Sequence, residues 1–206
     1  EAYGINWMKG IEVTAIHPKE KMLSLSNGES LSYDKVLIAT GASSFIPPVE
    51  NLRKAHHVIG LRNLEDAIYI KGMLPKIKNV VVLGAGLVGI DAVSGLWHSG
   101  VHVTLVEMGT RILPIQLDEY TAGVYEQRFR ENGVDIRLGV SAKKVEIDEN
   151  NNPTGVLLST GEMIPCDLII VATGVRANVA FLEESGIETD RFGLIVNAQC
   201  ATNTKD

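Results

Sequence analysis

The sequence has few cysteines and no long hydrophobic run. Only two of its 206 residues are cysteines, Cys166 and Cys200, and neither belongs to a C-x-x-C pair. We therefore expect no disulfide framework, no zinc site and no redox thiol from these two residues, and a reducing compartment, the cytoplasm, fits best. No run approaches the ~18 apolar residues that a membrane span needs. Residues 1–10 lack the basic start and apolar block of a signal peptide, so no membrane partner is expected.

The chain also lacks the patterns of nucleic-acid-binding proteins and of metalloproteins. Its formal net charge is −6, and no basic patch with interleaved aromatic residues is present, so nucleic acid is not an expected partner. No metal is expected either, because no histidine has a helical metal-binding spacing with acids. The five histidines are His17, His56, His57, His98 and His102.

The most informative stretch is residues 79–107, NVVVLGAGLVGIDAVSGLWHSGVHVTLVE. Residues 80–83 are apolar without polar alternation, which predicts a parallel strand covered on both faces. Gly84, Gly86 and Gly89 follow in G-x-G-x-x-G spacing. The first glycine permits a tight turn, the second lets a pyrophosphate approach the backbone, and the third lets a helix, predicted over residues 87–99, lie close on the sheet. The amino-terminal end of that helix would face the anion.

An acidic residue ends the next predicted strand. Glu107 follows Gly89 by 107 − 89 = 18 residues, close to the ~20 at which a carboxylate meets the ribose hydroxyls of an adenosine. A carboxylate at that point repels a 2′-phosphate, so NAD(H) is favoured over NADP(H). The alternative is a βαβ unit that binds nothing, which the agreement between strand, helix and acid disfavours.

The remaining elements follow from periodicity and turn signals. Residues 63–74 are predicted to form a helix with an apolar side made of Leu64, Ala67, Ile68, Ile70 and Leu74, and Pro47-Pro48 marks a boundary. A second helix is predicted over residues 118–132, with Val124, Tyr125 and Phe129 buried. Short strands are predicted over residues 11–16, 22–25, 36–38, 134–138, 143–147, 155–158, 168–171 and 194–196, and a short helix from residue 181.

Two segments of 19 residues repeat one pattern. Residues 23–41, LSLSNGESLSYDKVLIATG, and residues 156–174, VLLSTGEMIPCDLIIVATG, are identical at eight matching positions, including the closing Ala-Thr-Gly. The repeat predicts two nucleotide-binding folds of one design. Because no G-x-G-x-x-G precedes the first copy, we expect the chain to begin inside its first fold.

The sequence resembles the central part of the FAD-dependent pyridine nucleotide-disulfide oxidoreductases over nearly its whole length. This family includes NADH oxidases, NADH:rubredoxin and ferredoxin reductases, and the NADH-accepting part of nitrite reductase. The segments that carry the resemblance are YDKVLIATGAS, LRNLEDA, VVLGAGLVGIDAV, VTLVEMGTRILP, ENGVDI and DLIIVATGVRAN.

The resemblance implies an α/β fold in which a Rossmann-like NAD-binding domain, with a parallel sheet, helices and a β-meander, is inserted in a partial FAD-binding domain of the same type. The NAD(H)-binding domain would span residues 49–178. Residues 1–48 and 179–206 would belong to the FAD-binding domain. NADH would pass hydride to FAD in the full-length parent, and electrons would continue to a disulfide, oxygen or a protein carrier. This piece alone would hold no FAD and be inactive, and the resemblance allows a homodimer in the parent.

The family pattern also assigns site residues, none of them catalytic. Asp91 stands where the family usually has a glutamate near the nicotinamide, and its side chain is one methylene shorter. A second departure is Ala177, where the family commonly has proline. The residues implied to bind NAD are Gly84, Gly86, Leu87, Val88, Gly89, Asp91, Glu107 and Gly174, and those implied to lie beside FAD are Thr40 and Gly41.

Two other functions remain open. A non-catalytic NAD(H)-responsive binding module would use the same dinucleotide site, although the sequence offers no attached recognition element. A flavin-free NAD-dependent dehydrogenase would need a catalytic His or Lys beside the nicotinamide, and would leave the repeat unexplained. The residues that select the electron acceptor are not expected within this sequence.

Overall fold

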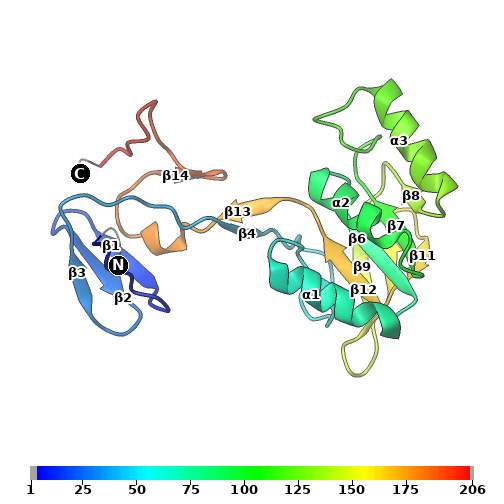
Figure 1. Ribbon diagram of the computed structural model, residues 1–206, viewed down its shortest axis with the longest axis horizontal. Helices are drawn as coiled ribbons and strands as arrows, with labels where there is room; N and C mark the ends of the chain where they lie inside the picture. The colour runs from blue at the N-terminus through cyan, green and yellow to red at the C-terminus, as the bar shows by residue number, and fades with distance from the viewer. Residues whose placement is uncertain (1–3, 205–206) are drawn as a thin grey trace. The chain divides into compact units, whose positions relative to one another are not determined.

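The computed structural model describes residues 4–204, which form two compact units (Figure 1). Unit 2 is the continuous segment Ser44–Val175, and unit 1 combines the residues before and after it. The boundaries expected from the sequence, after residues 48 and 178, lie 48 − 43 = 5 and 178 − 175 = 3 residues beyond the boundaries of the compact units.

A five-stranded parallel sheet is the centre of unit 2, which confirms the predicted α/β class. The strand order is β5-β12-β6-β7-β8, and every neighbouring pair is parallel. The strands are β5 (Val58–Ile59), β6 (Asn79–Leu83), β7 (His102–Val106), β8 (Asp135–Arg137) and β12 (Leu168–Val171). The other elements are α1 (Leu64–Met73), the 3-10 turn η1 (Leu74–Lys76), α2 (Leu87–Leu96), α3 (Glu119–Glu131), and a meander of β9 (Ala142–Ile147), β10 (Pro153–Leu158) and β11 (Met163–Pro165).

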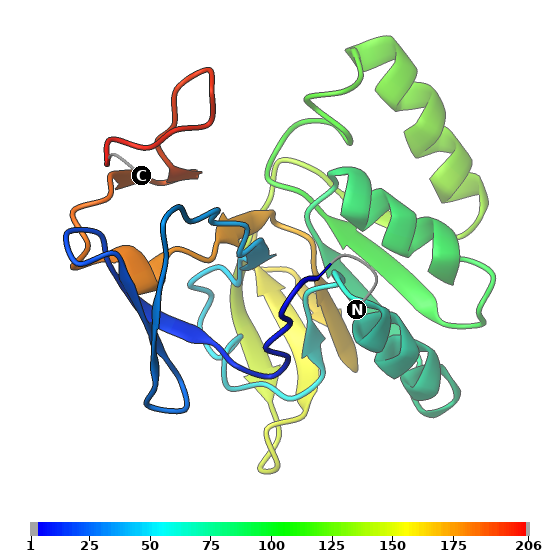
Figure 2. The same ribbon diagram turned by 60° about the vertical axis from the view of Figure 1, so that its left-hand side comes forward.

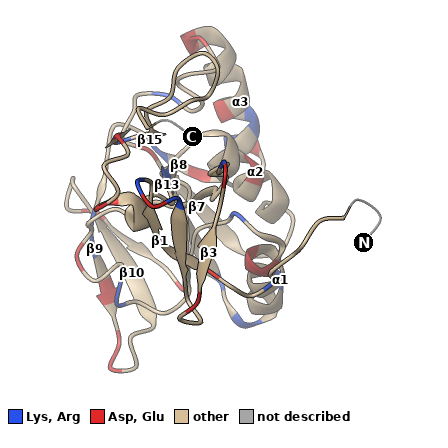
Figure 3. Cartoon of the chain, turned by 90° about the vertical axis from the view of Figure 1, so that its left-hand side faces the viewer, with Lys and Arg blue, Asp and Glu red and all other residues tan. Residues whose placement is uncertain are grey.

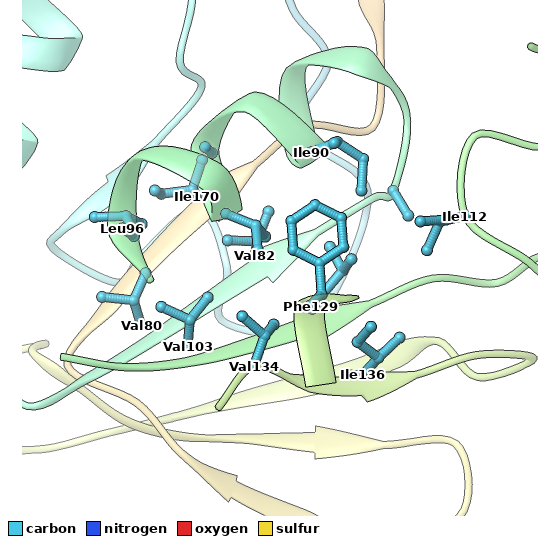
Figure 4. Close-up of a cluster of buried hydrophobic side chains, with 14 of the residues drawn as sticks. Val80, Val82, Ile90, Leu96, Val103, Ile112, Phe129, Val134, Ile136 and Ile170 are labelled. Carbon is cyan, nitrogen blue, oxygen red and sulfur yellow. The ribbon is translucent and has the colours of Figure 1, made fainter. Parts of the chain in front are cut away.

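Both faces of this sheet are covered, as the continuous apolar pattern of its strands requires. Val80 and Val82 of β6 pack with α2 and with Phe129 of α3 on one face (Figure 4). Val81 and Leu83 point to the other face, where they meet residues of the meander. Figure 2 shows the helices and the meander on opposite sides of the sheet. One strand therefore contributes alternate side chains to two cores.

Two helices form where the sequence predicts them, but their buried faces differ from the prediction. In α1 only Ile70 is buried, whereas Leu64 and Ile68 are 72% and 61% exposed. In α3 Phe129 is buried as predicted, but Val124 and Tyr125 are exposed. Each helix therefore buries fewer of its apolar side chains than the sequence pattern predicts. Helix α2 ends at Leu96, before the predicted end.

Unit 1 is built on a three-stranded antiparallel sheet, in the order β1-β2-β3. Its core contains Ile16, Leu23 and Leu25 from this sheet and Leu182 and Ile187 from the carboxyl-terminal segment. The bounds are β1 (Val13–His17), β2 (Met22–Leu25), β3 (Ser30–Ser32), η2 (Ala180–Leu182), β14 (Thr189–Asp190) and β15 (Gly193–Leu194). Two further short strands, β4 (Ala42–Ser44) and β13 (Val175–Ala177), pair where the chain passes between the units.

The strand predicted at residues 36–38 is not formed, and this prediction is wrong for the structure. Leu37 is 86% exposed and Val36 is 37% exposed. Within the described residues 4–204, no strand lies beside this segment to accept its backbone hydrogen bonds. A buried parallel strand needs neighbours on both edges and cover on both faces.

The internal repeat is nevertheless present in the turn geometry. Gly28 and Gly161 both have φ of +86°. The amide of Gly28 donates to the Leu25 carbonyl, and the amide of Gly161 donates to the Leu158 carbonyl, each at 3.0 Å. The same hairpin turn thus occurs twice, 161 − 28 = 133 residues apart.

The Ala-Thr-Gly endings of the repeat also make matching contacts. The Thr40 hydroxyl donates to the Asn178 carbonyl and the Thr173 hydroxyl to the Phe45 carbonyl, both at 2.8 Å. The amide of Asn178 donates to the Gly41 carbonyl at 3.0 Å, and the amide of Phe45 to the Gly174 carbonyl at 2.9 Å. Each Thr-Gly pair is therefore bonded to the residue four positions after the glycine of the other copy. Thr40 and Gly41 bond to Asn178, and Thr173 and Gly174 bond to Phe45.

Charged side chains of both signs occur along α3 (Figure 3). This helix carries Glu119, Glu126 and Glu131 as well as Arg128 and Arg130. Asp118 caps its amino terminus, and the hydrogen bond from the Thr121 amide lowers the pKa of the Asp118 carboxyl. Among the described residues, none of the helices has the length and apolar character needed to cross a bilayer.

Candidate functional site

A cavity of about 570 Å³ opens in unit 2 where three neighbouring strands end. It is lined by residues that follow β6, β7 and β12, which stand side by side in the sheet. The carboxyl edge of a parallel sheet is where ligands bind in folds of this type. Its volume lies within the ~300–1,000 Å³ of small-molecule and cofactor sites.

The three glycines of the turn after β6 differ in what surrounds them. Gly84 has φ of +102°, and a Cβ atom there would lie 2.5 Å from the Ala172 carbonyl oxygen. A Cβ atom at Gly89 would lie 1.9 Å from the Gly84 carbonyl oxygen, so this glycine is needed for the helix to lie against the turn. Gly86 has no atom within 4 Å of its Cβ position and lines the cavity. Its open face leaves room for a ligand to approach the backbone.

Helix α2 begins at this open face. Gly86 is its N-cap, with φ of −74° and ψ of −175°. Leu87 and Val88 form the first turn and line the cavity. The first amides of an α-helix have no carbonyl partner within the helix and lie at the positive end of its dipole. The turn can therefore hold a phosphate without a cationic side chain.

Glu107 orders the turn and lines the cavity at the end of β7. Its carboxylate accepts one hydrogen bond from the Ala85 amide and one from the Gly109 amide, each at 2.7 Å. Each carboxylate oxygen has a further lone pair, so the same group can still accept hydroxyl donors from the cavity.

The end of β12 forms another wall. Gly174 lines the cavity with φ of +105° and no atom within 4 Å of its Cβ position. Thr173 also lines it, and hydrogen bonds from the Thr173 hydroxyl and the Phe45 amide tie residues 173–174 to Phe45. A ligand could thus approach the backbone at both Gly86 and Gly174.

Four of the predicted site residues lie outside the cavity wall. Asp91 is exposed on α2 and is not among the lining residues. Gly89 acts in helix packing, as described above. Thr40 and Gly41 belong to unit 1, where both are hydrogen-bonded to Asn178.

Several wall residues escaped the sequence reasoning. Ser44, Ser141 and Gln116 contribute polar groups, and Arg62 contributes a positive charge. Arg62 and Glu107 are the only charged residues among those that line the cavity, all of which are described. Arg62 lies in the segment LRNLEDA, but its place on the wall depends on β5 pairing with β12, which the sequence does not reveal.

The two cysteines lie away from the cavity wall. Cys166 is buried behind the sheet, and burial raises the pKa of its thiol to about 12. A thiol with so high a pKa is a poor nucleophile at neutral pH. Cys200 is exposed in unit 1.

The arrangement fits an adenine dinucleotide in three respects. The wall has a backbone face for a pyrophosphate at Gly86, an acid for ribose hydroxyls at Glu107, and a second open backbone face at Gly174. The rest of the wall is largely apolar, including Leu61, Val140 and Val175. Apolar walls with a few convergent polar groups are typical of cofactor sites.

Comparison with known proteins gives a consistent result. The profile of the pyridine nucleotide-disulphide oxidoreductase family matches residues 2–206. The chain is 35% identical to the NADH-dependent phenylglyoxylate dehydrogenase subunit epsilon of Aromatoleum evansii over 193 residues, which are 93% of this chain and 45% of that protein. It is 32% identical to putidaredoxin reductase CamA of Pseudomonas putida over 205 residues, 98% of this chain and 48% of that protein.

The chain also resembles solved structures in its fold. A ferredoxin reductase for the CYP199A2 system from Rhodopseudomonas palustris superposes with a TM-score of 0.88 at 29% identity, over 94% of this chain and 47% of that one. The chain spans about half the length of the relatives it matches.

Proposed function

Since the chain belongs to the pyridine nucleotide-disulphide oxidoreductase family, we propose that unit 2 is its NAD(H)-binding domain and that the full-length protein passes hydride from NADH to FAD. The observation that carries the proposal is the cavity at the ends of β6, β7 and β12, with Gly86 open to it and Glu107 at its edge. When bound, NADH supplies the hydride and FAD accepts it; the residues of this chain bind and orient.

The roles we assign to the wall residues follow from their chemistry. The turn at Gly84, Gly86, Leu87 and Val88 holds the pyrophosphate by backbone amides. Glu107 accepts hydrogen bonds from the adenosine ribose and repels a 2′-phosphate, so NADH is preferred to NADPH. Gly174 lets the nicotinamide end pass close to the backbone. Asp91 does not line this cavity, so we assign it no contact.

We propose that unit 1 is part of the FAD-binding domain, with Thr40 and Gly41 at its flavin edge. The repeat supports this assignment. Val36 and Leu37 occupy the repeat positions of Ile169 and Ile170, which are buried in the sheet of unit 2. Residues 36–38, of which Val36 and Leu37 are exposed, would become a central strand once neighbouring strands are present, and the expected FAD domain would supply them. We adopt the boundaries of the compact units in place of residues 48 and 178.

The terminal acceptor is the least defined part of the proposal. Putidaredoxin reductase and the other ferredoxin reductases are named for protein carriers, and we propose a protein carrier, a disulfide or oxygen as the class of acceptor. A flavin-free dehydrogenase would need a His or Lys beside the nicotinamide. Among the described wall residues neither type occurs, which favours a flavin as the hydride acceptor.

Calorimetric titration of this chain with NADH and NADPH tests the dinucleotide assignment. We expect NADH to bind and NADPH to bind more weakly. Absence of NADH binding would contradict the assignment, and a preference for NADPH would contradict the role of Glu107. Purified chain should also carry no visible flavin absorbance; bound flavin would show that unit 1 is already a complete FAD site.

A further inference from the structure

The segment from Asp34 to Ile38 in unit 1 is explained neither by the core of that unit nor by the cavity of unit 2. We propose that this segment is a docking edge for a parallel β-strand from the rest of the full-length protein, and that the Asp34 carboxylate holds the start of that strand by accepting two of its backbone amides. The inference rests on the proposed function for the source of the strand, which is the FAD-binding domain.

Asp167 shows what an acid does at this point of the repeat. It immediately precedes β12, and its Oδ2 atom accepts the backbone amides of Lys78 and Asn79, each at 2.8 Å. The Asp167 amide in turn donates to the Asn79 carbonyl at 2.9 Å. Hydrogen bonds to a carboxylate are charge-assisted and roughly twice as strong as neutral ones. They join the start of β12 to the start of β6, and the two strands then pair in parallel along all four residues of β12.

Asp34 occupies the same position of the repeat, 167 − 34 = 133 residues earlier, but its carboxylate is not used in this way. The side chain is exposed, and within residues 4–204 its carboxylate makes no hydrogen bond or ion pair. The nearby Lys21 ammonium donates to the Asp34 backbone carbonyl instead, at 3.3 Å. Both carboxylate oxygens can therefore accept backbone amides from an incoming strand.

Residues 36–38 continue the match to β12. Val36 and Leu37 are 37% and 86% exposed, whereas all four residues of β12 are buried. Lys35 departs from the pattern, because its counterpart is the buried Leu168, so the apolar match begins one residue later. Unpaired backbone beside exposed apolar side chains is a template for strand addition.

The pairing in unit 2 also defines the strand that fits this edge. Two residues whose amides meet the carboxylate come first, and the apolar residues 80–83 follow, all of them buried. The next residue is Gly84, where a Cβ atom would lie 2.5 Å from the Ala172 carbonyl oxygen. Ala39 is the repeat counterpart of Ala172. The partner of residues 36–38 is therefore an apolar strand that ends in glycine beside Ala39.

Hydrogen exchange at the backbone amides of residues 36–38 tests the docking, measured by mass spectrometry on the 206-residue chain and on the full-length protein. We expect exchange at least about tenfold slower in the full-length protein, because the amides of a docked strand are bonded. Asp34→Ala should speed this exchange in the full-length protein by about tenfold, the loss expected from charge-assisted hydrogen bonds. In the 206-residue chain the same substitution should leave the thermal midpoint unchanged, because no bond is lost there.

Two other acids serve as matched controls. Asp167→Ala removes hydrogen bonds that exist within unit 2, so it should lower the thermal midpoint of both proteins. Glu20 is an exposed acid of unit 1 whose carboxylate has no bond within residues 4–204, and Glu20→Ala should change neither the midpoint nor the exchange. Asp34→Asn keeps an oxygen acceptor and should fall between Asp34→Ala and the native protein. It also supplies the comparison if the full-length alanine variant does not fold.

Three results would overturn the inference. Fast exchange of residues 36–38 in the native full-length protein would remove the docked strand. Native exchange in full-length Asp34→Ala would remove the role of the carboxylate. An equal loss of thermal midpoint in the 206-residue chain would assign Asp34 to a bond within unit 1. Visible flavin absorbance of the full-length protein reports on the proposed function separately: a colourless protein that still shows the Asp34 effect would contradict the FAD-binding domain as the source of the strand.

Discussion

Substitution of two glycines in the turn after β6 should separate folding from binding. The Cβ of Gly89→Ala would lie 1.9 Å from the Gly84 carbonyl oxygen and 3.4 Å from the Ala172 Cβ. The near atom is backbone, so the first turn of α2 must move away by about 1 Å. Overpacking of this kind costs about 3 kcal/mol, and the better helix propensity of alanine returns about 1 kcal/mol. We expect a net loss of about 2 kcal/mol, which lowers Tm by about 4–8 °C in a chain of this size.

Gly86→Ala should behave in the opposite way. No atom lies within 4 Å of its Cβ position, and φ of −74° is accessible to alanine. The cost in stability should stay near 0.5 kcal/mol, roughly the loss from a poorer N-cap. The new methyl group occupies the face on which a pyrophosphate would lie, so NADH affinity should fall at least tenfold, about 1.4 kcal/mol.

Urea unfolding and calorimetric titration with NADH on both variants check these expectations. Gly95→Ala is the control within the same helix, because Gly95 also has no atom within 4 Å of its Cβ position. It should be as stable as the native chain or up to about 1 kcal/mol more stable, with NADH binding unchanged. Full NADH affinity in Gly86→Ala, or native stability in Gly89→Ala, would refute the division of roles.

Three further predictions concern the carboxylate, the buried thiol and the repeated turns. Glu107→Ala removes two hydrogen bonds of 2.7 Å; we expect a loss of about 2 kcal/mol by urea unfolding and a weaker preference for NADH over NADPH by titration. Burial raises the pKa of the Cys166 thiol from 9.0 to about 12. Above pH 9 the unfolded chain ionises while the folded chain does not, so stability should fall by up to ~1.4 kcal/mol per pH unit to about pH 12. This slope should be absent in Cys166→Ala, and an equal slope in both proteins would assign it to other groups. Gly28→Ala and Gly161→Ala place alanine at φ of +86° without a clash, so each should cost about 1–2 kcal/mol by strain alone; clearly unequal costs would contradict the equivalence of the turns.

Local patterns predicted the elements of unit 2 well. The steric need of Gly89 arises against Gly84, which is close in sequence, so the glycine spacing was informative, whereas that of Gly84 arises against the distant Ala172. Apolar periodicity identified α1 and α3, yet it misjudged which side of each helix is buried. Leu64 and Val124 are apolar like the residues that pack, but burial depends on where the sheet lies, which is not a local property.

Residues 36–38 and β12 illustrate the limit of such patterns. Both segments are short apolar runs that end in Ala-Thr-Gly, and the sequence predicted a buried strand for each. Only β12 has neighbouring strands in the described part of the chain, and only β12 is a buried strand. A strand is stabilised by partners distant in sequence, so the same pattern can give two outcomes.

The sequence by itself determined the family, the glycine turn and the acid at the end of β7, because these rest on short-range spacing and on residue type. The tertiary structure decided which strand ends meet. The order β5-β12-β6-β7 brings Arg62, Gly174, Gly86 and Glu107 to one edge of the sheet and leaves Asp91 off the wall. Strand order arises from packing between segments far apart in the chain, and no local pattern encodes it.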